Sequence, residues 1–157
     1  MADAPGGVIV VPASDKERAS WAAMRHLLWP QLTPEQHRGE LDDLRCGGHR
    51  YAGLIALEIA GERAAIGFAE CSLRVDYVNG CETSPVAFLE GLWVAPGHRR
   101  RGVGRQLVDA AAGWALATGC REFASDALLD NEESHAFHRA VGFAETDRVV
   151  FFRRELR

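Results

Sequence analysis

The sequence predicts one α/β domain in which a central mixed β-sheet is flanked by helices. The chain has 157 residues, of which 47% are hydrophobic and 25% charged, as is typical of a single globular domain. Apolar runs of strand length alternate with apolar stripes at helical spacing, and Gly and Pro residues separate them. We expect residues 1–7 to form a flexible N-terminal extension and residues 8–157 to form the domain.

The N-terminal part of the domain predicts one strand and two helices. Residues 8–11, Val-Ile-Val-Val, have the pattern of a short buried strand. Residues 21–29 carry apolar side chains at helical spacing, and Pro30 ends this helix. Thr33 is the expected cap of a second helix with Pro at its first position, and we expect that helix to end at Leu44.

The middle of the chain predicts three strands. Residues 51–60 and 65–73 are expected to form a β-hairpin, because a Gly-Glu-Arg turn joins two strand-like runs. Residues 76–85 form a polar loop. Residues 86–94 are nearly all apolar, which indicates a central strand that is covered on both faces.

The C-terminal part predicts a helix, a strand, a second helix and a last strand. An apolar stripe starting at Val103 predicts a helix that stops at Gly119. Residues 122–125 are expected to form a short strand, residues 131–140 a helix, and residues 143–152 a closing strand. The complete expected order is β-α-α-β-β-β-α-β-α-β.

Charge and cysteine content exclude several classes of function. The 22 acidic and 18 basic residues give a formal net charge of −4, which argues against a nucleic-acid partner and favours cationic ones. The four cysteines form no CxxC pair, so we expect no metal and free, mostly buried thiols. The N-terminus lacks a basic export signal, and no segment is long enough to cross a bilayer. We therefore expect a cytoplasmic protein without a membrane partner.

A basic turn, His-Arg-Arg-Arg-Gly-Val-Gly, lies between the fourth predicted strand and the following helix. Gly102 and Gly104 let backbone N–H groups converge on an anion, and Arg99, Arg100 and Arg101 add positive charge. A pyrophosphate would match this arrangement. The turn lacks the Gly-Lys-Ser/Thr of a Walker loop, and a dinucleotide fingerprint would follow the first strand. By itself, the turn is equally compatible with a basic surface turn that binds nothing.

Two elements of the sequence resemble the GCN5-related N-acetyltransferase (GNAT) family. Arg99-x-x-Gly102-x-Gly104 resembles the family's (Arg/Gln)-x-x-Gly-x-(Gly/Ala) signature between the fourth strand and the third helix. Asn131, a helix and the Gly-Phe pair at 142–143 resemble its downstream element. The resemblance implies the GNAT acyl-CoA N-acyltransferase fold, with acetyl-CoA as co-substrate.

The same resemblance implies a set of coenzyme-binding residues. The backbone at residues 99–104 would hold the pyrophosphate, while one strand segment and an asparagine would bind the pantetheine. The implied residues are Leu92, Trp93, Val94, Arg99, Arg100, Arg101, Gly102, Val103, Gly104 and Asn131. Many family members have a Tyr seven residues after the Asn, proposed to protonate the leaving thiolate, and this chain has His138. A histidine can do the same work, and the alternative is that His138 only packs or faces solvent.

Segments spread over nearly the whole chain resemble the chromosomal-type aminoglycoside 6′-N-acetyltransferases. They are Leu-Trp-Pro at 28–30, residues 74–85, Phe-Leu-Glu-Gly at 88–91, Ala-Ser-Asp at 124–126 and residues 145–150. The resemblance implies acetylation of the 6′-amine of an aminoglycoside, and hence antibiotic resistance. It also implies that Glu90, Asp126 and Asp147 bind ammonium groups, while Trp29 and Tyr77 present ring faces to the sugar.

Glu90 also stands out without the resemblance, because it is the one charged residue of an apolar strand. A buried carboxylate needs a polar partner, and a cationic amine or its water would serve. The alternative is that Glu90 pairs with an arginine or faces solvent at a bulge. We predict direct transfer in a ternary complex, with Glu90 as base through water, Asp126 as second choice and His138 as acid. A backbone N–H near residues 92–94 is expected to hold the oxyanion.

Other functions stay open on the sequence alone. The chain could acetylate another amine, such as a polyamine or a protein N-terminus, or could bind acetyl-CoA without catalysis. The apolar residues 149–152 predict a terminal strand that needs cover. Because the resembled family is commonly dimeric through its C-terminal sheet, we expect a homodimer.

Overall fold

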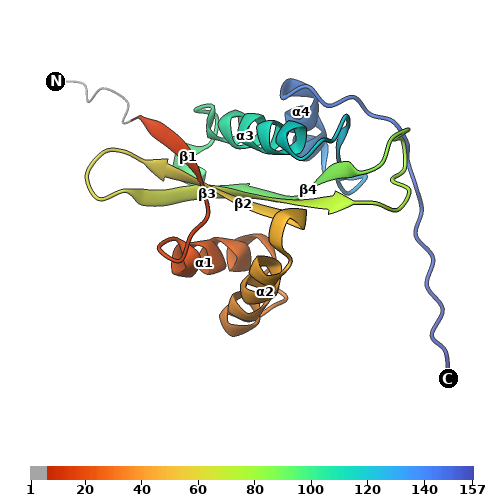
Figure 1. The fold of residues 1–157 in the computed structure, drawn as a ribbon, viewed down its shortest axis with the longest axis horizontal. Helices are drawn as coiled ribbons and strands as arrows, with labels where there is room; N and C mark the ends of the chain where they lie inside the picture. Colours follow the sequence, from red (N-terminus) through yellow and green to blue (C-terminus); the bar gives the residue numbers. More distant parts are fainter. Residues whose placement is uncertain (1–6) are drawn as a thin grey trace.

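The computed structural model describes residues 7–157, in which a five-stranded mixed sheet lies between two layers of helices (Figure 1). Neighbouring strands are antiparallel, except that the last pair is parallel. In chain order and in sheet order alike, the strands are β1 (Val8–Pro12), β2 (Tyr51–Glu58), β3 (Ala64–Arg74), β4 (Val86–Val94) and β5 (Phe123–Ser125). This is the predicted mixed α/β fold.

Two helices cover each face of the sheet (Figure 1). One face carries α1 (Arg18–Leu28) and α2 (Pro34–Cys46), and the other carries α3 (Val103–Ala117) and α4 (Glu132–Ala140). Two short 3₁₀ turns, Gly48–Arg50 and Pro96–His98, precede β2 and the basic turn. Among residues 7–157, no helix is long and apolar enough to cross a membrane.

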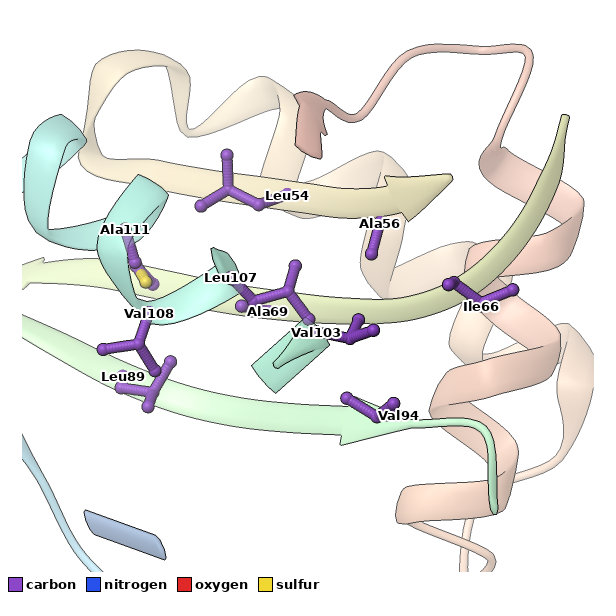
Figure 2. Close-up of a cluster of buried hydrophobic side chains, with 11 residues drawn as sticks. Leu54, Ala56, Ile66, Ala69, Leu89, Val94, Val103, Leu107, Val108 and Ala111 are labelled. Atoms are coloured by element: carbon purple, nitrogen blue, oxygen red, sulfur yellow. The ribbon is translucent and has the colours of Figure 1, made fainter. Parts of the chain in front are cut away.

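The apolar stripe of α3 builds the larger part of the core. Val103, Leu107 and Ala111 are fully buried, as their spacing predicts, and pack on side chains from β2, β3 and β4 (Figure 2). Burial of one such leucine contributes about 1.5–3 kcal/mol. On the opposite face, Trp21 of α1 and Phe68 of β3 belong to a second cluster. The sheet therefore has an apolar layer on both sides, which holds its central strands rigid.

Local signals set the helix ends as expected. Thr33 caps α2 in a reciprocal capping box with Gln36, and Pro34 opens the helix. After α3, Gly119 adopts a positive φ of 85°, a conformation that favours glycine. At α1, the residue before the helix is Glu17, which makes no side-chain cap hydrogen bond.

The predicted closing strand over residues 143–152 is wrong for the single chain. This segment has no strand structure, and its last residues leave the body of the domain (Figure 1). The side chains of Val150, Phe151 and Phe152 are 77%, 87% and 94% exposed. Its β-branched and aromatic residues favour a strand, but a strand needs a neighbour to pair with, and no strand of residues 7–157 lies beside it.

The predicted flexible extension at residues 1–7 falls mostly on residues 1–6, which lie outside the described residues. Gly7, the first described residue, accepts a hydrogen bond from the N–H of Ile59. All four cysteines are free, as expected, but only Cys71 and Cys120 are buried, while Cys46 is exposed.

Candidate active site

The edge of β4 is open beyond Leu89. Parallel pairing with β5 covers only three residues of β4, and Leu89 is the last of them. The strand continues to Val94 and stays paired with β3 on its other side. Among residues 7–157, no strand pairs with the rest of β4 on the β5 side. The edge at Leu92, Trp93 and Val94 therefore offers backbone hydrogen-bonding groups to an extended ligand.

The basic turn has the backbone shape of an anion site. Arg100 and Gly102 have φ values of 62° and 84°, and such left-handed residues direct neighbouring N–H groups to one side. A Cβ built on Gly102 would meet no atom within 4 Å, so the space beside it is open. Gly102 also caps α3, whose positive dipole end faces this space.

The arginines of the turn have different environments. Arg99 donates from Nε to the carbonyl oxygen of Val94 at 2.8 Å, which ties the turn to the end of β4. Arg100 and Arg101 are exposed, and within residues 7–157 neither forms an ion pair. Their charge is therefore available to a phosphate.

Gly104 is a packing residue as well as part of the turn. A Cβ on Gly104 would lie 2.9 Å from the ring of Phe137 on α4, so glycine lets α3 and α4 approach. That Cβ would point into the protein rather than into the path of an anion. The N–H groups of Val103 and Gly104 lie in the first turn of α3, where backbone donors lack helical partners.

Helix α4 places two of the predicted residues beside β5. Asn131 caps the helix, and its Oδ1 accepts from the N–H of Ser134 at 3.0 Å. Its amide nitrogen stays available to donate to a ligand. His138 is half-buried, and its Nε2 lies 2.8 Å from Ser125 Oγ at the end of β5. His138 therefore faces the sheet instead of solvent.

Two pockets meet at Glu90. The first has a volume of about 590 Å³, and its lining includes Trp29 and Glu90. The second, of about 420 Å³, is lined by Tyr77, Arg74 and Glu90 among others. The Trp29 ring lies so close to Gly91 that a Cβ atom on residue 91 would be only 2.4 Å from the ring. The structure thus brings together three of the five residues predicted to bind substrate.

Glu90 is an extra residue within β4. The β3–β4 register shifts between Glu70 and Cys71, so Glu90 has no partner and forms a β-bulge, a feature common beside active sites. Arg74 donates to its carboxylate at 2.8 Å, and the hydroxyl of Ser72 donates as well. Glu90 is therefore not an unpaired buried carboxylate. The alternative interpretation, an arginine partner at a bulge, is confirmed, and Glu90 still lines both pockets.

A buried charged cluster that sequence analysis missed forms the floor of the first pocket. Glu70 of β3 accepts hydrogen bonds from Arg25 at 3.1 Å and from Trp21 at 2.8 Å, and Arg25 also pairs with Glu40. Burial raises the pKa of Glu70 to about 7, although Arg25 and Trp21 act in the opposite direction. The available signal was a lone arginine on the apolar face of one helix and a lone acid in an apolar strand.

The same cluster positions Trp29. Arg25 donates from Nε to His37 Nδ1 at 3.3 Å, so His37 donates from Nε2 to the carbonyl oxygen of Trp29 at 3.0 Å. The guanidinium of Arg25 lies 5.0 Å from the Trp29 ring centroid, and Phe68 packs edge-on at 6.1 Å. Trp29 is therefore both a core residue and a pocket wall.

Glu122 anchors the loop that carries Tyr77. Its carboxylate accepts from the N–H groups of Thr83 and Glu82 at 2.6 and 2.9 Å, and from the Thr83 hydroxyl. These hydrogen bonds, with the Thr83 side chain first, lower the pKa of Glu122. These hydrogen bonds restrain the loop, while Tyr77 stays exposed at the second pocket.

Asp126 and Asp147 lie outside the lining of both pockets and are exposed. Asp126 directly follows β5. Asp147 was expected on a final hairpin and lies instead in the segment that follows α4. The neighbouring Thr146 packs so closely on Gly80 that a Cβ there would be 2.1 Å away. Asp147 is thus held beside the loop that carries Tyr77.

Comparison with known protein families identifies the family of this chain. Residues 21–143 match the model of the acetyltransferase (GNAT) family. The chain belongs to this family. A GNAT acetyltransferase takes its acetyl group from acetyl-CoA, and the open β4 edge and the unobstructed space at Gly102 fit that co-substrate. Within residues 7–157, no cluster of His, Cys, Asp or Glu could hold a metal ion.

Individual GNAT relatives are similar over nearly the full chain. The chain is 45% identical to an aminoglycoside N(6')-acetyltransferase type 1 from Acinetobacter genomosp. 13, covering 94% of this chain and 98% of that one. It is 47% identical to one from Serratia marcescens, covering 87% and 92%. The structure of AAC(6')-Ih from Acinetobacter baumannii has a TM-score of 0.87 at 44% identity, covering 96% and 99%.

A further solved GNAT structure contains an analogue that joins the two substrates in one molecule. AAC(6')-Iy in complex with the bisubstrate analogue CoA-S-monomethyl-acetylneamine has a TM-score of 0.88 at 39% identity, covering 96% of this chain and 99% of that one. These comparisons confirm the fold class and the family that the sequence motifs indicated.

Proposed function

We propose that this protein transfers the acetyl group of acetyl-CoA to the 6′-amino group of aminoglycoside antibiotics, and so confers resistance. The observation that carries the proposal is the similarity over nearly the whole chain to aminoglycoside N(6')-acetyltransferases. The structure also has two pockets lined by aromatic rings and carboxylates, and both kinds of group suit a polycationic sugar. The bisubstrate complex of a relative supports direct attack by the amine in a ternary complex.

The coenzyme side of the site uses main-chain groups. In our proposal, the turn from Arg99 to Gly104 holds the pyrophosphate, and Arg100 and Arg101 add charge. The open edge of β4 pairs with the pantetheine, and Asn131 donates to it from the nitrogen that its helix cap leaves available. A backbone N–H of the same edge is well placed to receive the developing oxyanion.

The acceptor side uses Glu90 at the meeting point of the two pockets. We propose that Glu90, through water, removes a proton from the 6′-ammonium, with Asp126 as the second choice. Trp29 and Tyr77 present ring faces from opposite pockets, and Asp147 attracts a more distant ammonium group. His138 then supplies the proton that the departing thiol needs.

We also propose a homodimer that acts in the cytoplasm. Residues 143–157 form no strand in the single chain, and the exposed apolar side chains of Val150, Phe151 and Phe152 would be covered by pairing with a second copy. The four free cysteines are as expected of a reducing compartment.

The substrate proposal predicts a strict dependence on the 6′-nitrogen. An aminoglycoside with a 6′-hydroxyl should bind through the same carboxylates but turn over at least about a hundredfold slower than its 6′-amino counterpart. Coupled thiol-release assays would give the rates, and mass spectrometry with NMR would locate the acetyl group. Efficient acetylation of the 6′-hydroxyl compound at another nitrogen would contradict the regiochemistry. Tight acetyl-CoA binding without turnover of any amine would instead indicate a non-catalytic module.

A further inference from the structure

A serine–histidine pair lies at the point where β4 and β5 separate. The parallel pairing ends at Leu89 and Ser125, and Ser125 Oγ is 3.5 Å from the carbonyl oxygen of Leu89. His138 reaches this point from α4, with Nε2 at 2.8 Å from Ser125 Oγ. Both side chains are half-buried. The hydroxyl therefore lies between the histidine and the start of the open edge that receives the coenzyme.

The hydrogen bonds around His138 show which group donates and which accepts in the Ser125–His138 pair. His138 Nδ1 is 2.7 Å from the carbonyl oxygen of Ser134, and a carbonyl can only accept, so Nδ1 carries the hydrogen. In the neutral imidazole, Nε2 is then an acceptor, and the Ser125 hydroxyl donates to it at 2.8 Å in preference to the carbonyl oxygen of Leu89 at 3.5 Å. The ring of Phe143 packs on the imidazole at 5.3 Å and restricts its rotation.

This orientation bears on how His138 can act. Its Nε2 faces Ser125, where the pairing of β4 and β5 ends, so a proton exchanged between His138 and a ligand at the open edge would pass through the Ser125 hydroxyl. A neutral imidazole held by a carbonyl on Nδ1 can take up a proton on Nε2 and later return it. Ser125 is positioned to pass that proton in both directions.

We propose that Ser125 and His138 work as one proton relay during acetyl transfer, a proposal that rests on the acetyltransferase function given above. Once the amine nitrogen has bonded to the acetyl carbon, it carries one proton too many. That proton passes to Ser125 Oγ while the proton of the Ser125 hydroxyl passes to His138 Nε2. When the C–S bond breaks and the electron pair stays on sulfur, His138 returns its proton to Ser125, and Ser125 gives one to sulfur. The nitrogen has lost one proton, the sulfur has gained one, and both residues are restored.

The kinetic test uses single and double variants. Ser125→Ala and His138→Gln should each lower kcat by about a hundredfold or more, with KM values within about twofold of the wild type. Because the two residues act as a unit, the double variant should lose no more than either single variant. Ser125→Thr keeps a hydroxyl and should restore most of kcat, and Ser20→Ala on the exposed face of α1 serves as control.

Several kinetic outcomes would overturn the relay. One is a Ser125→Ala variant whose kcat stays within about threefold of the wild type. Another is a double variant whose loss of kcat equals the product of the losses in the two single variants. A third is a folded Ser125→Thr variant that is as slow as Ser125→Ala. Calorimetric acetyl-CoA binding and thermal melts of each variant separate these results from misfolding or loss of the coenzyme. Mass spectrometry after incubation with acetyl-CoA alone should find no acetylated Ser125, and its detection would replace the relay by a covalent route.

A second readout needs no substrate. Nitrogen-15 NMR of the imidazole should show hydrogen on Nδ1 of His138 and a hydrogen-bond-accepting Nε2, and Ser125→Ala should shift only the Nε2 signal. Hydrogen on Nε2 in the wild type would overturn the proposal. If the wild type acetylated no aminoglycoside, the substrate proposal would fail, whereas this measurement and the kinetics with any accepted amine would still test the relay.

Discussion

Replacement of Glu70 by glutamine should make the protein more stable at high pH while leaving it nearly unchanged at low pH. The carboxyl of Glu70 is almost fully buried against Arg25 and Trp21, and burial raises its pKa from an ordinary value of 4.5 to about 7. Below 4.5, Glu70 is protonated in both the folded and the unfolded protein. Between 4.5 and 7, only the unfolded state releases this proton, so rising pH favours unfolding.

The size of the effect follows from the two pKa values. A tenfold change in proton affinity corresponds to about 1.4 kcal/mol, so Glu70 should remove about 3 kcal/mol of stability as pH rises through 7. Glutamine resembles the protonated acid and has no charge to bury, and Arg25 keeps Glu40 as a partner. The variant should therefore gain about 3 kcal/mol over the wild type at pH 8 but less than about 1 kcal/mol at pH 5.

Urea unfolding at pH 5, 6, 7 and 8 measures this difference directly. With a slope of about 2 kcal/mol per molar urea, the midpoint of Glu70→Gln should exceed that of the wild type by roughly 1–2 M at pH 8. Glu62→Gln, in the exposed β2–β3 turn, is the matched control and should follow the wild type. A stability difference between wild type and Glu70→Gln that stays constant from pH 5 to 8 would refute the reasoning.

Three further predictions concern the site and the assembly. Glu90→Gln should lower kcat about a hundredfold or more, whereas Asp147→Asn should mainly raise KM in steady-state kinetics; full kcat in Glu90→Gln across the pH profile would make Asp126 the base. Gly102→Val should abolish acetyl-CoA binding in calorimetry, because it strains a φ of 84° and fills the open space, and unchanged affinity in a folded variant would exclude the phosphate turn. Light scattering should give a dimer mass, and a monomer mass at micromolar concentration would contradict the proposal that residues 143–157 pair with a second copy.

The features predicted correctly from sequence depend on neighbours in the chain. The cap at Thr33, the stripe of α3 and the turn at Gly102 each involve residues within a few positions of one another, so their spacing contains the information. The family motifs are of the same kind. That is why the fold class, the family and most element boundaries could be predicted.

The features that were missed connect distant parts of the chain. Arg25 and Glu70 are 45 positions apart, and each looks like an isolated charge until the fold brings α1 onto β3. The bulge at Glu90 was only an alternative on the sequence, because it depends on a register shift against β3 that the composition of β4 does not encode. The segment over residues 143–152 has strand propensity, but a strand forms only where an edge is available to it.

Two of the carboxylates that line the first pocket, Glu70 and Glu90, differ in whether a substrate amine can bind to them. The Arg25–Glu70 pair has side chains only 6% and 8% exposed, so a ligand ammonium could replace Arg25 only by being buried itself, at a large desolvation cost. The Arg74–Glu90 pair is 41% and 34% exposed, and pairs of this kind contribute about 0–1 kcal/mol. A polycationic ligand can therefore displace Arg74 from Glu90 at small cost, but it cannot displace Arg25 from Glu70. This difference favours Glu90 as the residue that meets the amine, and it leaves Glu70 to hold the pocket floor and, through Arg25 and His37, the wall formed by Trp29.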